Sequence, residues 1–106
     1  MDDNQPSFVE LPETLYELPC DIVLLAMGFI GPEQDGILTE LDIELDERGN
    51  VARDSNWMTN RTGVFTAGDM QRGQSLIVWA IAEGRSAARA IDVYLMGETD
   101  LPNSLI

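Results

Sequence analysis

The sequence predicts an α/β fold in which a small β-sheet is followed by a long C-terminal helix. Two short apolar runs, at 22–27 and 64–67, have the composition of buried strands. From residue 75 onward apolar residues recur at every third or fourth position, which is typical of one helical face. A chain of 106 residues is long enough for one small domain or for part of a larger one.

The N-terminal part is predicted to hold an arm and one strand. Prolines at positions 6, 12 and 19 indicate that residues 1–19 form an extended arm or an edge strand, because proline donates no hydrogen bond to a ladder. The chain is thus predicted to divide into this arm and a second unit, residues 20–106. Within it the run IVLLAM at 22–27 is predicted to be a strand that is buried on both faces. The sequence GFIGP at 28–32 then ends the strand.

The middle of the chain is predicted to contain a hairpin between irregular segments. Residues 33–41 have the pattern of a short helical turn. In 43–52, apolar and acidic residues alternate and are followed by the turn sequence ERGN, which is typical of a β-hairpin. Residues 53–63 are expected to form a polar loop, and residues 64–67 a second short buried strand.

The C-terminal part is predicted to be one helix over residues 76–96. Ser75 is a suitable N-cap residue, and Gly97 is suitable for ending the helix in a left-handed conformation. The face that we expect to be buried contains Ile77, Ile81, Gly84, Ala88, Ile91 and Leu95.

The composition argues against several classes of function. The formal net charge is −13 and all six basic residues are arginine, so neither nucleic acid nor an anionic membrane surface is an expected partner. The absence of histidine excludes a histidine-based catalytic or metal site, and a single cysteine excludes an intrachain disulfide. The acidic N-terminus lacks a signal-peptide pattern and no apolar run approaches membrane-spanning length, so we expect a cytoplasmic protein.

The stretch VFTAGDMQRGQS at 64–75 places a glycine and a carboxylate between a predicted strand and a predicted helix. Gly68 lets a ligand approach the backbone closely, and Asp69 offers two acceptor oxygens to the hydroxyl groups of a polyol. The helix start offers N–H groups and a positive partial charge, which favour a ring that gains electron density. These features suit the ribityl chain and ring of a flavin. A Gly-Asp pair by itself is more often a capped turn in a loop.

The longer context resembles a known family. Thr59 together with VFTAGD at 64–69 resembles the second flavin-binding motif of flavoprotein oxidoreductases that have two dinucleotide-binding domains. Residues 68–97, together with DIVLLAMGFIGP at 21–32, resemble one branch more closely: the C-terminal segment of the NADPH-linked glutamate synthase small (beta) subunit. The resemblance runs from residue 20 or so to Pro102.

The resemblance implies a fragment of a FAD/NAD(P)-binding Rossmann-like domain and gives the site residues their roles. Asp69 is expected to bond to the ribityl chain of FAD, and Gly68 is expected to permit its approach. Ser75, Leu76 and Ile77 would place the helix start near the pyrimidine edge of the flavin. No catalytic residue and no metal ligand is expected in this chain.

The resemblance also implies that parts of the family's machinery lie outside this chain. Gly28 and its neighbours would form the crossover between the nucleotide-binding parts, but GFIG at 28–31 lacks the G-x-G-x-x-G spacing of a pyrophosphate loop. Cys20 alone cannot supply an iron–sulfur site. NADPH and the iron–sulfur clusters would therefore bind only in the full small subunit, whose partner is the large subunit that forms glutamate.

By itself, the chain is expected to be inactive, to bind FAD weakly or not at all, and to self-associate through exposed apolar surface. Two alternatives to this interpretation stay open. In the first, the chain is a segment of a related flavoprotein reductase. In the second, it is a non-catalytic acidic interaction domain that keeps the fold without the flavin.

Overall fold

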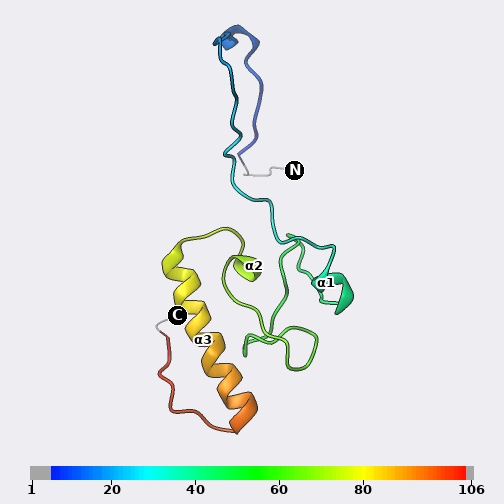
Figure 1. The fold of residues 1–106 in the computed structure, drawn as a ribbon, viewed down its shortest axis with the longest axis vertical. Helices are drawn as coiled ribbons and strands as arrows, with labels where there is room; N and C mark the ends of the chain where they lie inside the picture. Colours follow the sequence, from blue (N-terminus) through cyan, green and yellow to red (C-terminus); the bar gives the residue numbers. More distant parts are fainter. Residues whose placement is uncertain (1–5, 105–106) are drawn as a thin grey trace.

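One long helix packs against an irregular body, and an extended arm leaves that body (Figure 1). The computed structural model describes residues 6–104. In chain order the elements are the 3₁₀ helix η1 (Pro12–Thr14) and the α-helices α1 (Ile37–Glu40), α2 (Asp69–Arg72) and α3 (Ile77–Met96). The small sheet that the sequence predicts is not confirmed. Residues 6–104 contain two isolated antiparallel bridges, and neither of them belongs to a β-strand.

Residues 6–30 form the arm, which runs away from the body and turns back to it (Figure 1). All of these residues are exposed, and η1 is the one regular element among them. The strand predicted at 22–27 lies in this arm and is not formed among the described residues, and its side chains are exposed: Leu24 and Met27 are 85% and 86% exposed. A strand of this kind needs pairing on both edges and cover on both faces, and no other described residue pairs with it. Residues 1–5 lie outside the described residues.

A small core lies where α1 meets the predicted hairpin. Leu38, Ile43 and Val51 are buried, and partly buried apolar side chains pack against them. Leu45 and Val51 form one antiparallel bridge, and the turn between them is closed by the N–H of Asp46, which donates to the carbonyl of Asn50 at 2.7 Å. The hairpin predicted at 43–52 is therefore present as a tight turn with a single bridge.

A second bridge pairs Met58 with Phe65. The N–H of Thr59 donates to the carbonyl of Val64 at 2.8 Å, and the N–H of Thr66 donates to the carbonyl of Trp57 at 2.9 Å. Part of the segment predicted as a polar loop, 53–63, is thus the antiparallel partner of the segment predicted as a strand, 64–67. The sequence pattern missed this pairing because only three residues of each segment take part in it.

The helix predicted over 76–96 is confirmed as α3, which begins one residue later, at Ile77. It ends at Gly97, whose φ of 82° is left-handed and whose N–H donates to the carbonyl of Val93 at 2.8 Å. The sequence predicted Ser75 as the N-cap, and this prediction is wrong. That position is Leu76, and no side chain caps the helix.

The buried face of α3 differs from the predicted one. Its two buried residues are Glu83 and Ala87, whereas Ile77 and Leu95 on the predicted face are 80% and 70% exposed. The apolar periodicity therefore marks a face that residues 6–104 leave mostly exposed, with Ile91 as its partly buried member. The face that does pack inward is anchored by a carboxylate.

Candidate functional site

The Gly68–Asp69 turn connects the second bridge to α2. Gly68 is buried and has φ 75° and ψ −152°, a backbone conformation that is essentially confined to glycine. Its carbonyl accepts the N–H groups of Gln71 and Arg72 at 3.1 and 2.9 Å, which begins α2. The glycine therefore fixes the direction in which the chain leaves the bridge and presents the next residue.

The carboxylate of Asp69 is exposed on this turn. Its Oδ1 atom accepts the hydroxyl of Ser75 at 3.2 Å, so Ser75 steadies the aspartate instead of capping α3. The Oδ2 atom has no hydrogen-bond partner among residues 6–104. One carboxylate oxygen is thus positioned and the other is available to a ligand.

Asp69 lines an open hollow of about 580 Å³ between the arm end and α2. Phe29, Gly31 and Gln74 also line it, and the side-chain amide of Gln74 donates to the carbonyl of Phe29. The lining includes the carboxylates of Glu33 and Asp35 and no basic side chain. Such a surface suits hydroxyl and N–H donors and disfavours phosphate.

The turn is held from behind by Glu83 of α3, whose side chain is completely buried. Its Oε1 atom accepts the N–H of Gly68 at 3.0 Å and the side-chain amide of Gln71. Its Oε2 atom forms an ion pair with Arg72. We call this cluster the Glu83 latch. It connects α3 to Gly68, at the start of the turn, and to Gln71 and Arg72 of α2.

Arg72 completes the latch from the surface. Its guanidinium lies over the indole ring of Trp79, 4.2 Å from the ring centroid. A cation over an aromatic face adds roughly 0.5–1 kcal/mol at an exposed site. Trp79 is 38% exposed, and its ring covers one side of the guanidinium that pairs with Glu83.

The latch also sets the ionisation of Glu83. Burial by itself would raise the pKa of Glu83, but hydrogen bonds from Arg72, from Gln71 and from the Gly68 N–H outweigh it, together with the charge of Arg72. The pKa of Glu83 is therefore lowered below its ordinary value of 4.5. The group stays ionised, and its charge is matched inside the fold.

This lowered pKa predicts an acid-dependent stability. Because the pKa of Glu83 is lower in the folded state, its contribution to stability is fully present above the ordinary pKa of 4.5 and is lost as the pH falls through the folded pKa. Urea unfolding of the native chain and of Glu83→Gln should therefore differ most at pH 6 and converge toward pH 3. Glu98→Gln, at an exposed acid, is the control. A difference that is independent of pH would contradict the assignment.

The structure brings together most, but not all, of the residues that the sequence singled out. Gly68, Asp69 and Ser75 lie together at the turn, and Leu76 and Ile77 follow as the exposed start of α3. Gly28 does not line the hollow, but its neighbour Phe29 does. Nothing lies within 4 Å of the position that a Cβ of Gly28 would occupy.

Sequence reasoning missed the latch. Glu83 is the one acid between Asp69 and Asp92, and it lies in the apolar sequence AIAEG. A charged residue that interrupts an otherwise apolar helical stretch is a usable signal for a buried, paired carboxylate. The pattern does not reveal its partner, because Arg72 lies beyond the start of the helix.

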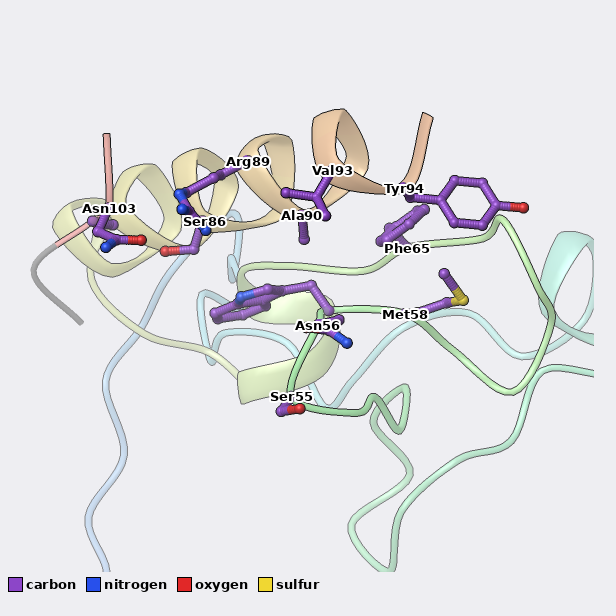
Figure 2. A pocket seen from close by; sticks show the side chains of 12 residues that line it. Ser55, Asn56, Met58, Phe65, Ser86, Arg89, Ala90, Val93, Tyr94 and Asn103 are labelled. Carbon is purple, nitrogen blue, oxygen red and sulfur yellow. The ribbon is translucent and has the colours of Figure 1, made fainter. Parts of the chain in front are cut away.

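A second hollow of about 580 Å³ lies beside the C-terminal half of α3 (Figure 2). We call it the aromatic hollow, because Trp57, Phe65 and Tyr94 line it. Arg89 and Asn103 also line it. It shares no lining residue with the hollow beside Asp69.

The comparisons with known proteins define the family. A family model described as pyridine nucleotide-disulphide oxidoreductase matches residues 2–84. Since this is most of the chain, the chain belongs to the pyridine nucleotide-disulphide oxidoreductase family, whose domain is Rossmann-like and binds FAD and NAD(P).

Three of its similar relatives are glutamate synthases or their small chains. The glutamate synthase [NADPH] small chain of Mycobacterium tuberculosis (strain ATCC 25618 / H37Rv) is 61% identical over 95 residues, which are 90% of this chain and 20% of that protein. The corresponding chain of Bacillus subtilis (strain 168) is 47% identical, over 90% of this chain and 19% of its own length. The glutamate synthase [NADH] of Schizosaccharomyces pombe is 44% identical, over 79% of this chain and 4% of its length. The chain thus spans a fifth or less of each of these relatives.

Two further findings concern membranes and metals. Among residues 6–104, no helix is both long and apolar enough to cross a membrane. In the same part of the chain, no three His, Cys, Asp or Glu side chains are grouped so that they could hold a metal ion.

Proposed function

We propose that this chain is the C-terminal, FAD-contacting segment of an NADPH-dependent glutamate synthase small subunit. The observation that carries the proposal is the 61% identity to such a small chain over 90% of this sequence. The position of Asp69 supports it, because the matched region includes the turn that presents this carboxylate beside a hollow.

The residues at the turn fit the uncharged middle of FAD. The Oδ2 atom of Asp69 is an acceptor for a ribityl hydroxyl, and Ser75 holds the other oxygen in place. The start of α3 follows directly, and its positive partial charge favours a reduced, anionic ring. Gly68 gives the backbone close approach at this point.

The same hollow does not fit the pyrophosphate of FAD. Glu33, Asp35 and Asp69 line it and no arginine does, so a phosphate group would meet negative charge there. In the proposal, the pyrophosphate loop, the NADPH site and the iron–sulfur clusters belong to the rest of the small subunit. Bound FAD would supply electron transfer between NADPH and the iron–sulfur clusters, and Asp69, Ser75 and Gly68 would hold it at this turn. The residues of this chain bind and orient the cofactor.

Flavin binding tests the proposal in two settings. Charge-assisted hydrogen bonds that the carboxylate of Asp69 accepts contribute roughly 1.5–3 kcal/mol each, against an association cost of about 4–15 kcal/mol. We therefore expect the isolated chain to purify without stoichiometric flavin. A chimera in which this chain replaces the matched 95 residues of the M. tuberculosis small chain should purify with FAD. In the chimera, Asp69→Ala should weaken FAD binding by roughly 10- to 100-fold.

Asp100→Ala is the matched control, because Asp100 is an exposed acid in the segment that follows the C-terminal end of α3. Flavin fluorescence on titration gives the affinity in each case. A yellow isolated chain with stoichiometric flavin would contradict the predicted weakness of the partial site. A chimera that folds but binds no FAD, or one that is equally sensitive to Asp100→Ala, would count against the proposed function.

We also propose that the isolated chain self-associates. Ile22, Leu24 and Ile77 are 76%, 85% and 80% exposed, and large exposed apolar areas are typical of surfaces that are covered in an assembly. Sedimentation velocity should show a dimer or larger species whose share rises with concentration. Ile77→Glu should shift this distribution toward monomer, whereas Glu98→Gln should not. A monomer mass at every concentration would refute the expectation.

A further inference from the structure

We propose that the aromatic hollow binds a small planar aromatic compound that carries one anionic group, a carboxylate or a phosphate. This inference is independent of the proposed flavin contact, because the two hollows have no lining residue in common. The volume of about 580 Å³ lies within the range of roughly 300–1,000 Å³ that is typical of small-molecule sites.

One end of the hollow is aromatic. Phe65 and Tyr94 meet edge to face, with ring centroids 5.7 Å apart and an interplanar angle of 68°. Figure 2 shows them beside Met58, where the bridge segment passes under the end of α3. Aromatic and thioether side chains favour a flat ring through stacking and edge contacts.

The indole of Trp57 is the third aromatic wall, and it is held in place. Trp57 has a φ of 65°, which is uncommon and costly for a bulky residue. The carboxylate of Asp54 accepts the N–H groups of Asn56 and Met58 at 2.8 and 3.0 Å, which keeps the turn closed. The guanidinium of Arg53 lies over the indole, 3.7 Å from the ring centroid. The wall is therefore formed before any ligand arrives.

The other end of the hollow is positively charged and rich in donors. Figure 2 shows Arg89, Ser86 and Asn103 together there. The Nε of Arg89 donates to the carbonyl of Leu101 at 3.2 Å, and its terminal nitrogens have no hydrogen-bond partner among residues 6–104. No acidic side chain lines the hollow, although the sequence contains 19 acids. A ring at one end and an anion at the other match this distribution.

The test uses NMR of the full chain and three matched probes. They are 2-naphthoate, 2-naphthyl phosphate and the uncharged 2-naphthalenemethanol. The readout is the indole N–H signal of Trp57, which Trp79→Phe distinguishes from the other tryptophan of the sequence. We expect saturable shifts of this signal, with at least one anionic probe binding roughly 10-fold or more tightly than the alcohol, as one charge-assisted hydrogen bond implies. The ratio of the affinities for 2-naphthoate and 2-naphthyl phosphate shows which anionic group the hollow prefers.

Variants of Arg89 test the role of the charge. Arg89→Gln should remove the preference for the anion, and Arg89→Lys should keep most of it. Arg85→Gln, one turn earlier on α3 and outside this hollow, should leave it unchanged. Equal binding of the alcohol and the anions, an Arg89→Gln variant that is folded and still prefers the anion, or no saturable shift with any probe would overturn the proposal.

Discussion

Replacing Arg72 by glutamine is expected to lower the free energy of unfolding by about 1.5–3 kcal/mol, because the buried carboxylate of Glu83 loses its ionic partner while solvent at the 37% exposed arginine screens the pair. The substitution leaves the carboxylate of Glu83 charged and completely buried, with only the Gly68 N–H and the amide of Gln71 as donors. The chain has a small core, so this loss is a large share of a total stability of about 5–15 kcal/mol. Urea unfolding followed by circular dichroism measures it.

Two companion variants separate the buried charge from other effects. Arg85→Gln removes an exposed arginine of α3 and should change stability by no more than about 0.5 kcal/mol. The double variant Arg72→Gln, Glu83→Gln should be more stable than Arg72→Gln alone, because no unpaired charge remains inside. If Arg72→Gln and Arg85→Gln cost the same, the latch does not stabilise the fold.

Gly68→Ala is expected to destabilise the chain by about 1–3 kcal/mol through the backbone alone. A Cβ at this position would meet the Cβ of Ala80 at 3.8 Å, which is ordinary contact, so there is no clash. The cost arises because φ 75° and ψ −152° are accessible to glycine and hardly to alanine. A shift of the backbone would also move the Gly68 N–H away from Glu83.

Gly84→Ala provides a control with the opposite sign. Gly84 lies inside α3, and nothing is within 4 Å of the position its Cβ would occupy. Alanine is favoured over glycine in a helix interior by roughly 0.5–1 kcal/mol, so this variant should be more stable than the native chain. Thermal or urea unfolding of Gly68→Ala, Gly84→Ala and the native chain measures the change in stability that each substitution causes. Equal effects of the same sign would exclude backbone strain at Gly68 as the cause.

The sequence predicted those features that depend on neighbouring residues. The length of α3 and its end at Gly97 follow from local periodicity and from the conformational freedom of glycine, and both agree with the structure to within one residue. The turn at 46–50 follows from its Asp, Gly and Asn residues in the same way. The contact between Asp69 and Ser75 was not predicted, because the sequence assigned Ser75 to the N-cap of the helix, whereas its hydroxyl donates to Asp69.

Features that depend on distant partners were predicted less well. The apolar run at 22–27 and the Ile77 face of α3 have the pattern of buried surface, but residues 6–104 leave them mostly exposed. A hydrophobic pattern indicates which side chains are suited to burial. It does not indicate whether the segments that would cover them are present. The Glu83 latch was missed for a related reason, since a buried charge is stabilised by specific partners that composition does not name.

The short sequence separations within the Glu83 latch favour its early formation during folding. Gly68, Gln71 and Arg72 precede Glu83 by 15, 12 and 11 residues, so joining them closes only short loops of chain. Loop-closure entropy grows slowly with length, and local contacts of this kind form fast. The helix and the turn that it holds can therefore assemble as one cooperative unit while the arm is still unpaired. The shape of the Gly68–Asp69 turn is fixed by residues that follow it closely, and it does not depend on the arrival of any remote part of the molecule.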